Sequence, residues 1–195
     1  MPRKDARKSI LDSARNFFYK YGFKRVSIEE ICREAGVSRK TFYVYFPNKN
    51  ELAIEILKQI FDSANSEFIS IMESEEDFAS KMSRYIQFKA ELTKSISMEF
   101  ANDIFNSDIP EISDYYKKIN EQGMELTRSC FQVAQENFEL RSDLSIDMIL
   151  YVSDTLMNLC NEMQFQALFA SYEDMMSQVT KMFIYGIIGN TDISK

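Results

Sequence analysis

Side chains able to bind a polyanion are concentrated in a short segment near the amino terminus. Two cations and three hydroxyl-bearing residues occur within seven positions: Arg39, Lys40, Thr41, Tyr43 and Tyr45. Such groups donate hydrogen bonds to phosphate oxygens and to the edges of bases. A helix that carried them would fit the major groove of B-DNA, where residues at its amino end reach the bases. The segment therefore indicates contact with nucleic acid.

Two short helices are needed to position this segment. Ser27 and Glu30 have the spacing of a capping box, which predicts a helix that begins after Ser27 and ends at Gly36. Ser38 can cap a second helix that runs to about Phe46, before the next proline. Glycine adopts the left-handed backbone conformation that lets the second helix leave at a steep angle. The pattern predicts a helix-turn-helix with a small apolar core: Ile31, Ala35, Val37 and Phe42.

Charge is distributed unevenly along the chain. The 195 residues include 23 basic and 30 acidic side chains, and this net charge of −7, taken as an average, disfavours a polyanionic partner. The first 58 residues, however, hold 13 basic and 7 acidic side chains, a net charge of +6, so the remaining residues carry −13. A basic segment of this kind either meets phosphate or is simply a solvated charged face.

Composition also excludes several classes of protein. The chain has 0 histidines, so a Ser-His-Asp triad, an imidazole zinc site and a histidine pH switch cannot form. No phosphate-binding glycine loop is present either. We therefore expect no enzymatic activity, no cofactor and no metal site. A helical enzyme that uses only paired carboxylates is the remote alternative.

Cysteine usage and hydropathy indicate the compartment. Cys32, Cys130 and Cys160 are far apart and lack CxxC spacing, which is typical of reduced thiols in a cytoplasmic protein. Asp12 and Arg15 interrupt the first apolar stripe, and no apolar run approaches the roughly 20 residues that span a bilayer. We expect a cytoplasmic protein without a signal peptide or membrane association.

The periodicity of apolar residues predicts an all-α fold with nine helices and no strand. The scarcity of turn-forming residues, 5 Gly and 3 Pro, agrees with this class. The seventh helix is expected over residues 110–138. The eighth would begin at residues 142–145 and reach about Leu168, and the ninth would begin at residues 171–174 and end between Gly186 and Gly189.

The run VSIEEICREAGVSRKTFYVYFPNKNELAIEIL, residues 26–57, resembles the DNA-binding signature of the TetR family of bacterial transcription regulators. The resemblance covers about residues 5–58 closely and is only architectural beyond them. It implies a two-domain protein, with a three-helix helix-turn-helix domain at residues 1–48 and a helical ligand-binding and dimerisation domain at residues 49–195. Its implied function is DNA-binding regulation of transcription.

The resemblance also implies roles for individual residues. Ser27 and Lys49, at two helix starts, would meet backbone phosphates, and Arg39 would contact guanine O6 and N7. The remaining expected DNA contacts lie between them: Ser38, Lys40, Thr41, Tyr43 and Tyr45. Many relatives have histidine at the position of Tyr45. Phe42 and Phe46 are assigned to the core.

For the second domain the resemblance implies a homodimer and a small-molecule effector. The last two helices would form a four-helix bundle with those of a second chain, through Ile149, Leu156, Cys160, Met176, Val179 and Phe183. Adaptable apolar side chains could line an effector pocket: Phe61, Tyr85, Phe88, Phe100, Met124 and Phe131. An ordinary monomer core is the alternative for both sets.

The expected function is a homodimeric repressor that binds a palindromic double-stranded DNA operator and is released by a small hydrophobic or aromatic ligand. In the alternatives, a protein of the same fold acts as an activator, or as a DNA-bound architectural or cell-division factor without a ligand. A body without a cavity would favour the architectural alternative.

Overall fold

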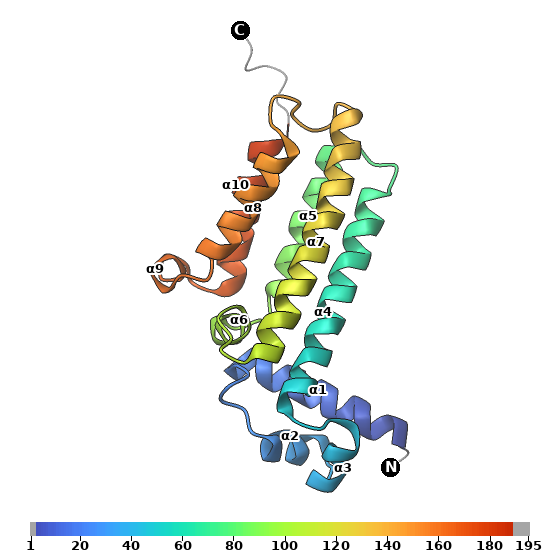
Figure 1. Ribbon diagram of the computed structural model, residues 1–195, viewed down its shortest axis with the longest axis vertical. Coiled ribbons are helices and arrows are strands. Elements are labelled where there is room, and N and C mark those ends of the chain that lie inside the picture. Colours follow the sequence, from blue (N-terminus) through green and yellow to red (C-terminus); the bar gives the residue numbers. More distant parts are fainter. Residues whose placement is uncertain (1–2, 189–195) are drawn as a thin grey trace. The chain divides into compact units, whose positions relative to one another are not determined.

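The computed structural model describes residues 3–188, which form ten α-helices (Figure 1). The helices are α1 (Arg3–Tyr21), α2 (Ile28–Ala35), α3 (Arg39–Tyr45), α4 (Lys49–Met72), α5 (Phe78–Thr93), α6 (Met98–Phe105), α7 (Pro110–Glu136), α8 (Ile146–Leu159), α9 (Met163–Gln166) and α10 (Tyr172–Ile187). Within these residues the β-structure is limited to an isolated antiparallel bridge between Leu140 and Ile188. The predicted all-α fold class is thus confirmed. None of the helices described is both long and apolar enough to cross a membrane.

The tenth helix arises because the predicted eighth helix is interrupted. It ends at Leu159 as α8, instead of continuing to about Leu168, and the short α9 follows. The backbone N–H groups just after α8 bond to carbonyls only three residues back, which tightens the chain and ends the helix. The buried Gln166 side chain then donates to the Cys160 carbonyl at 3.0 Å, so a carbonyl at the helix end is satisfied.

Short polar side chains begin several helices, as their spacing predicts. The hydroxyls of Ser27, Ser38 and Ser171 each accept a hydrogen bond from the backbone N–H three residues later. The carboxylate of Asp77 does the same for α5, and the side-chain oxygen of Asn48 does so for α4. These caps determine where each helix starts.

The chain divides into two compact units that are each discontinuous in sequence. Unit 1 comprises the described part of Met1–Ser63 together with Ser95–Lys117, and unit 2 comprises Ala64–Lys94 with the described part of Lys118–Lys195. The long helices α4 and α7 therefore contribute to both units. The predicted domain boundary after residue 48 does not coincide with these packing units and remains a prediction about function.

Unit 1 is held together by an apolar core that joins α1–α4 to α6. The ring of Phe18 stacks on that of Phe100 from α6, with 6.4 Å between centroids, and meets Phe23 edge-on at 5.4 Å. Phe42 and Phe46 of the predicted helix-turn-helix are buried in the same core, as their assignment requires. Burial of each large apolar side chain stabilises the fold by about 2 kcal/mol.

Unit 2 is built around α5 and α10, which pack side by side. Phe78 of α5 meets Phe131 of α7 edge-on, with 6.3 Å between centroids, in a core that also includes Met82, Ile149, Leu150 and Ile184. The last helix, predicted to end between Gly186 and Gly189, ends at Ile187, and Gly189 lies outside the described residues.

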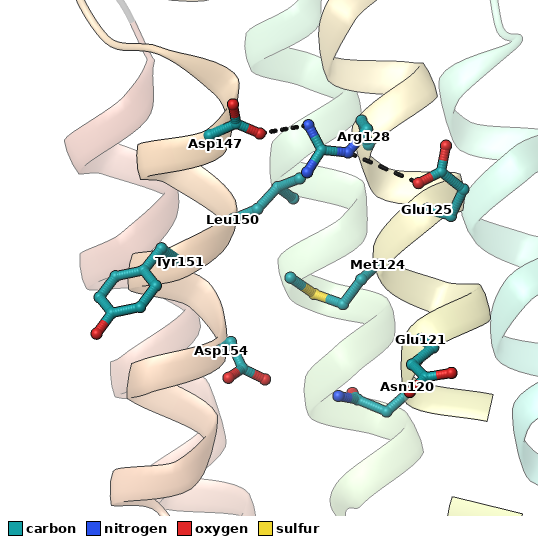
Figure 2. A pocket seen from close by; sticks show the side chains of 9 residues that line it. All are labelled: Asn120, Glu121, Met124, Glu125, Arg128, Asp147, Leu150, Tyr151 and Asp154. Carbon is teal, nitrogen blue, oxygen red and sulfur yellow. Dashed lines mark hydrogen bonds and ion pairs between the residues drawn. The ribbon is translucent and has the colours of Figure 1, made fainter. Parts of the chain in front are cut away.

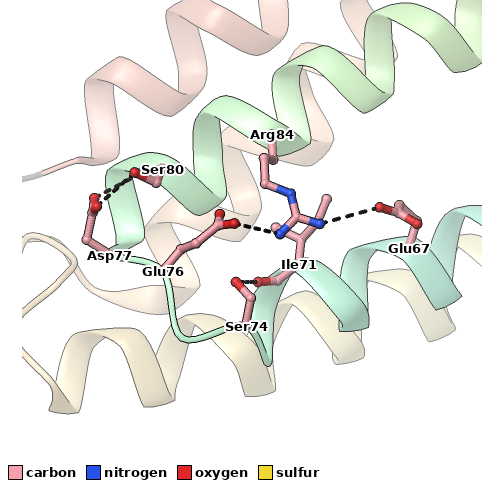
Figure 3. A network of polar contacts seen from close by, with 7 residues as sticks. All are labelled: Glu67, Ile71, Ser74, Glu76, Asp77, Ser80 and Arg84. Atoms are coloured by element: carbon pink, nitrogen blue, oxygen red, sulfur yellow. Dashed lines mark hydrogen bonds and ion pairs between the residues drawn. The ribbon is translucent and has the colours of Figure 1, made fainter.

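A polar network fixes the turn between α4 and α5 (Figure 3). The guanidinium of Arg84 on α5 lies 3.0 Å from the Glu76 carboxylate and 3.9 Å from that of Glu67 on α4. The Ser74 hydroxyl donates to the Ile71 carbonyl at 2.8 Å, which closes the end of α4. Because these ion pairs are partly exposed, each contributes less than about 1 kcal/mol, and their main effect is to define the turn.

Candidate functional site

The turn between α2 and α3 has the geometry that the sequence predicts. Gly36 adopts the left-handed conformation, with φ of 65° and ψ of 33°, and the Val37 N–H donates to the Cys32 carbonyl at 3.0 Å. A residue with a Cβ would be strained at this φ. Buried Ile31 and Phe42 pack into the core shared with α1 and α4. These contacts fix α3 against α2 and leave its opposite face to solvent.

The outer face of α3 carries the groups expected to bind DNA, together with one that the sequence prediction missed. Arg39 and Lys40 are exposed, and Tyr43 is 46% exposed. Val44, which was not among the predicted contacts, is 65% exposed. It follows Lys40 by four positions, so helical spacing alone places it on the same face. Tyr45 is half-buried and packs against the core of unit 1.

Arg39 interacts with two neighbouring side chains, Glu29 and Tyr43. One of its terminal nitrogens lies 2.6 Å from the Glu29 carboxylate of α2. The hydrogen bond with Tyr43, followed by the charge of Glu29, raises the pKa of Arg39 above its ordinary value. Both members of the ion pair are more than half exposed, so the pair is easily exchanged for a contact with DNA.

The hydroxyl groups at the helix starts serve mainly as caps. Ser38 and Thr41 lie with their hydroxyl oxygens 2.9 Å apart, and the Ser38 oxygen accepts the Thr41 N–H at 3.1 Å. The Ser27 hydroxyl and amide both donate to the Glu30 carboxylate, at 2.7 and 2.8 Å, and these bonds lower the pKa of Glu30. A phosphate at Ser27, as the sequence predicts, would have to displace this carboxylate.

Lys49, expected to meet a phosphate, points into unit 1. Its ammonium donates to the carbonyls of Phe23 and Val26 at 2.9 Å each and of Lys24 at 3.3 Å. It also lies 4.4 Å from the centroid of the Phe23 ring, and burial lowers its pKa. An ammonium has three hydrogens, and all three are used here. Lys49 therefore fastens the loop between α1 and α2 to the start of α4.

The six predicted pocket residues are divided between the two units, and three of them, Tyr85, Met124 and Phe131, share the apolar core of unit 2. Phe61 and Phe100 belong to unit 1, whereas the other four belong to unit 2. Phe100 packs against Phe18, and Phe131 against Phe78, so both are core residues. Tyr85 packs against Phe68 and Phe88 is half-buried on the same helix, α5. Aromatic residues at helical spacing most often fill the core, which is the alternative that the sequence left open.

Unit 2 instead contains a groove between α7 and α8, with a volume of about 440 Å³ (Figure 2). Of the predicted pocket residues, Met124 lines it. The remaining lining residues are mostly polar: Asn120, Glu121, Glu125, Arg128, Asp147, Leu150, Tyr151 and Asp154. The sequence prediction named only aromatic and methionine side chains for the pocket, whereas most of these residues are polar. The volume falls within the range of small-molecule sites.

Most residues predicted for the dimer interface are buried within the chain itself. Ile149, Cys160, Met176 and Val179 are buried, whereas Leu156 and Phe183 are half-buried. The same two helices nevertheless expose large apolar side chains on another face. We call these residues the apolar stripe: Met148, Tyr151 and Val152 on α8, with Met182 and Tyr185 on α10. Spacings of three and four residues place these side chains on one face of each helix.

The three cysteines are free thiols at separate places. Cys32 and Cys160 are buried, Cys130 is half-buried, and burial raises the pKa of each thiol above its ordinary value. Protonated thiols are poor nucleophiles and poor metal ligands. Among residues 3–188, no three cysteine or carboxylate side chains are grouped so that they could hold a metal ion.

Part of the chain is similar in sequence to known bacterial regulators. Residues 10–56 match the family described as bacterial regulatory proteins, tetR family. The chain is 34% identical over 90 residues to the HTH-type transcriptional regulator RutR of Escherichia coli, which covers 45% of this chain and 41% of RutR. The match thus spans less than half the length of that relative.

Solved structures share the fold over nearly the whole chain. A protein from Saccharomonospora viridis in complex with choline matches with a TM-score of 0.75 at 18% identity, over 95% of this chain and 99% of that one. Reduced NemR of Escherichia coli matches with a TM-score of 0.73 at 16% identity, over 97% of this chain and 100% of NemR. At such identities these structures establish the fold alone. Residues 10–56, which include the helix-turn-helix, thus match the tetR family of bacterial regulatory proteins, and nearly the whole chain has the fold of these solved structures.

Proposed function

We propose that this protein is a DNA-binding regulator of transcription, and that it acts as a homodimeric repressor released by a small-molecule effector. The observation that carries the proposal is the outer face of α3, where Arg39, Lys40, Tyr43 and Val44 are exposed on a helix anchored by buried Phe42. The cations and the phenol suit phosphates and base edges, and the valine suits a thymine methyl group.

The proposed dimer forms through the apolar stripe of α8 and α10. Soluble monomers rarely expose several large apolar side chains together, so such a face favours a partner. Two helices from each protomer would form a four-helix bundle around a two-fold axis. A two-fold dimer carries two copies of α3, which suits an operator with two half-sites about one or more DNA turns apart.

The effector is supported by the groove between α7 and α8, because a ligand-free architectural factor would need no such space. The structurally similar protein from Saccharomonospora viridis was solved with choline, so this fold can hold a small molecule. The dimer would have two conformations that differ in the distance between the two copies of α3, and only one of them would fit the operator. An effector that binds the other conformation more tightly would shift the population toward it and release the DNA.

DNA binding can be tested by fluorescence anisotropy with the DNA upstream of the protein's own gene, at several salt concentrations. Replacement of Lys40 (Lys40→Gln) should weaken binding to all sequences and make the salt slope shallower by about one unit, because one phosphate contact is lost. The matched control is Lys118→Gln, which removes the same charge from an exposed position of α7 in unit 2. It should leave binding unchanged.

Equal effects of the two substitutions would contradict the assignment of α3 as the DNA-contacting helix. Failure of the wild-type protein to bind either upstream or unrelated DNA would refute the proposed function as a whole. Transcription from the same DNA in vitro then distinguishes repression from activation. Fewer transcripts on addition of the protein indicate a repressor, and more transcripts indicate an activator.

A further inference from the structure

The groove of unit 2 is lined by facing stripes of α7 and α8 that form three levels (Figure 2). The α7 stripe has spacings of four residues and the α8 stripe has spacings of three and four, so each stripe lies on one helix face. The residues are Asn120, Met124 and Arg128 on α7, and Asp147, Leu150 and Asp154 on α8. Arg128 and Asp147 form a charged level, Met124 and Leu150 an apolar level, and Asn120 and Asp154 a polar level.

At the charged level the positive charge is already compensated. Arg128 lies 2.6 Å from the Asp147 carboxylate across the groove and 3.6 Å from that of Glu125 on its own helix. Two carboxylates therefore share one guanidinium. An anionic ligand would find no uncompensated cation at this end, and Arg128 serves to join α7 to α8 (Figure 2).

At the polar level the negative charge is not compensated. The Asp154 carboxylate accepts a hydrogen bond from the Asn158 side-chain amide at 3.1 Å, and no ion pair is formed by Asp154 or by Glu121 within the described part of the chain. Four carboxylates and one arginine line the groove, so its formal charge is −3. A cleft of one sign attracts ligands of the opposite sign.

Between these levels the groove is apolar. Half-buried Met124 of α7 faces Leu150 of α8, which is itself only 3% exposed. A thioether adapts to irregular apolar shapes. A hydrated metal ion would gain nothing from this thioether, whereas an organic cation would bury carbon surface against it.

We propose that this groove binds a lipophilic organic cation, such as a quaternary ammonium or phosphonium compound, and, resting on the function proposed above, that this cation is the effector. The positive centre would lie beside Asp154, and the apolar body would lie against the half-buried Met124. The groove volume of about 440 Å³ accommodates a compound with several rings or a long apolar chain.

Two ions of nearly equal size and opposite charge provide the test. Isothermal titration calorimetry of the purified full-length protein, without DNA, should show tetraphenylphosphonium binding at least about tenfold more tightly than tetraphenylborate, because the groove carries excess negative charge. The substitution Asp154→Asn keeps the shape of the side chain and should weaken phosphonium binding about fivefold. Glu136→Gln, an exposed position at the end of α7 away from the groove, removes the same charge and should change binding less than twofold.

A second variant adds a cation to the groove instead of removing an anion. Asn120→Lys places an ammonium opposite Asp154 and should reduce phosphonium binding more than tenfold. Circular dichroism of both groove variants should match the wild type, since Asn120 and Asp154 are only partly buried on helix surfaces.

The outcomes separate the groove from the DNA-binding function. If the protein binds its upstream DNA but does not prefer the phosphonium ion, or if Asp154→Asn and Glu136→Gln have equal effects, the cation site is refuted and the regulator stands. If phosphonium binding depends on Asp154 while no DNA is bound, the cation site is supported and the proposed regulatory function fails. Release of DNA by the phosphonium ion from the wild type, and not from Asp154→Asn, supports both.

Discussion

At the scale of single residues, the polar groups near α3 divide into those that are exposed and those already engaged. Lys40 is exposed on the outer face of α3, whereas the Ser27 donors are bound by Glu30. Arg39 is intermediate, because its ion pair with Glu29 lies at the surface and can be exchanged. The sequence pattern does not distinguish these cases, since a capping serine and a phosphate-binding serine have the same position at a helix start.

Lys49 allows its structural and DNA-binding roles to be separated by experiment. The substitution Lys49→Met should lower the free energy of unfolding by about 2 kcal/mol, because three backbone carbonyls lose their donor. Urea denaturation measures this change, and Lys58→Met, at an exposed position of the same helix, is the control. Unchanged stability together with a salt slope of DNA binding that is shallower by about one unit would instead assign Lys49 to a phosphate contact.

At the scale of elements, α6 is attached both to the last turn of α1 and to the loop that precedes α2. The Lys24 N–H donates to the Asp103 carboxylate of α6 at 2.8 Å, and the Ser97 N–H donates to the Tyr19 carbonyl at 2.8 Å. Lys49 holds the other side of the same loop. The loop between α1 and α2 is therefore held by both α4 and α6, and its conformation determines where α2 begins.

Two glycines of unit 1 should differ in their tolerance of a side chain. Both have positive φ, but a Cβ at Gly22 would lie 2.7 Å from the Asp103 carboxylate and 3.3 Å from the Glu99 Cβ, whereas at Gly36 nothing lies within 4 Å. Gly36→Ala should therefore cost about 1 kcal/mol of backbone strain. Gly22→Ala adds a steric clash with α6 and should cost about 3 kcal/mol.

Urea denaturation of both glycine variants measures this difference. Equal losses of stability would mean that α6 does not pack closely against the loop at Gly22. A loss confined to Gly36→Ala would contradict the arrangement around α6 altogether.

At the scale of the whole molecule, the apolar stripe of α8 and α10 is a surface that the fold of one chain leaves uncovered. Tyr151 is 75% exposed and Tyr185 is 70% exposed, although the same helices bury Ile149 and Met176. A helix that is apolar around most of its circumference needs neighbours on two sides. The core of unit 2 covers one side, and the proposed second protomer covers the other.

The substitution Tyr185→Glu tests the proposed dimer. A carboxylate on the stripe would be buried without a partner in the interface, so we expect the dimer to dissociate in sedimentation equilibrium and operator affinity to fall at least about tenfold. Phe138→Glu changes an aromatic residue that is 90% exposed in the loop after α7 and should leave the dimer intact. A Tyr185→Glu protein that remains dimeric would exclude this face.

The sequence by itself determined the helix-turn-helix and all the helices except the break between α8 and α9, because caps, glycine stops and apolar periodicity act over a few residues. Ser27, Gly36 and Ser38 could be assigned correctly from spacing alone, and so could the burial of Phe42. The sequence also identified Arg39, Lys40 and Tyr43 on the outer face of α3, but it included Tyr45, which packs against the core, and it omitted Val44, which helical spacing would have added.

Only the tertiary structure decided which face of each helix packs against another helix and which face stays exposed. It placed Phe100 in the core of unit 1, turned Lys49 toward backbone carbonyls, and opened a polar groove beside Met124. It also separated buried Ile149 from the exposed stripe on the same helix. These outcomes depend on contacts between residues far apart in the chain, and an apolar or charged residue type does not specify which distant neighbour will cover it.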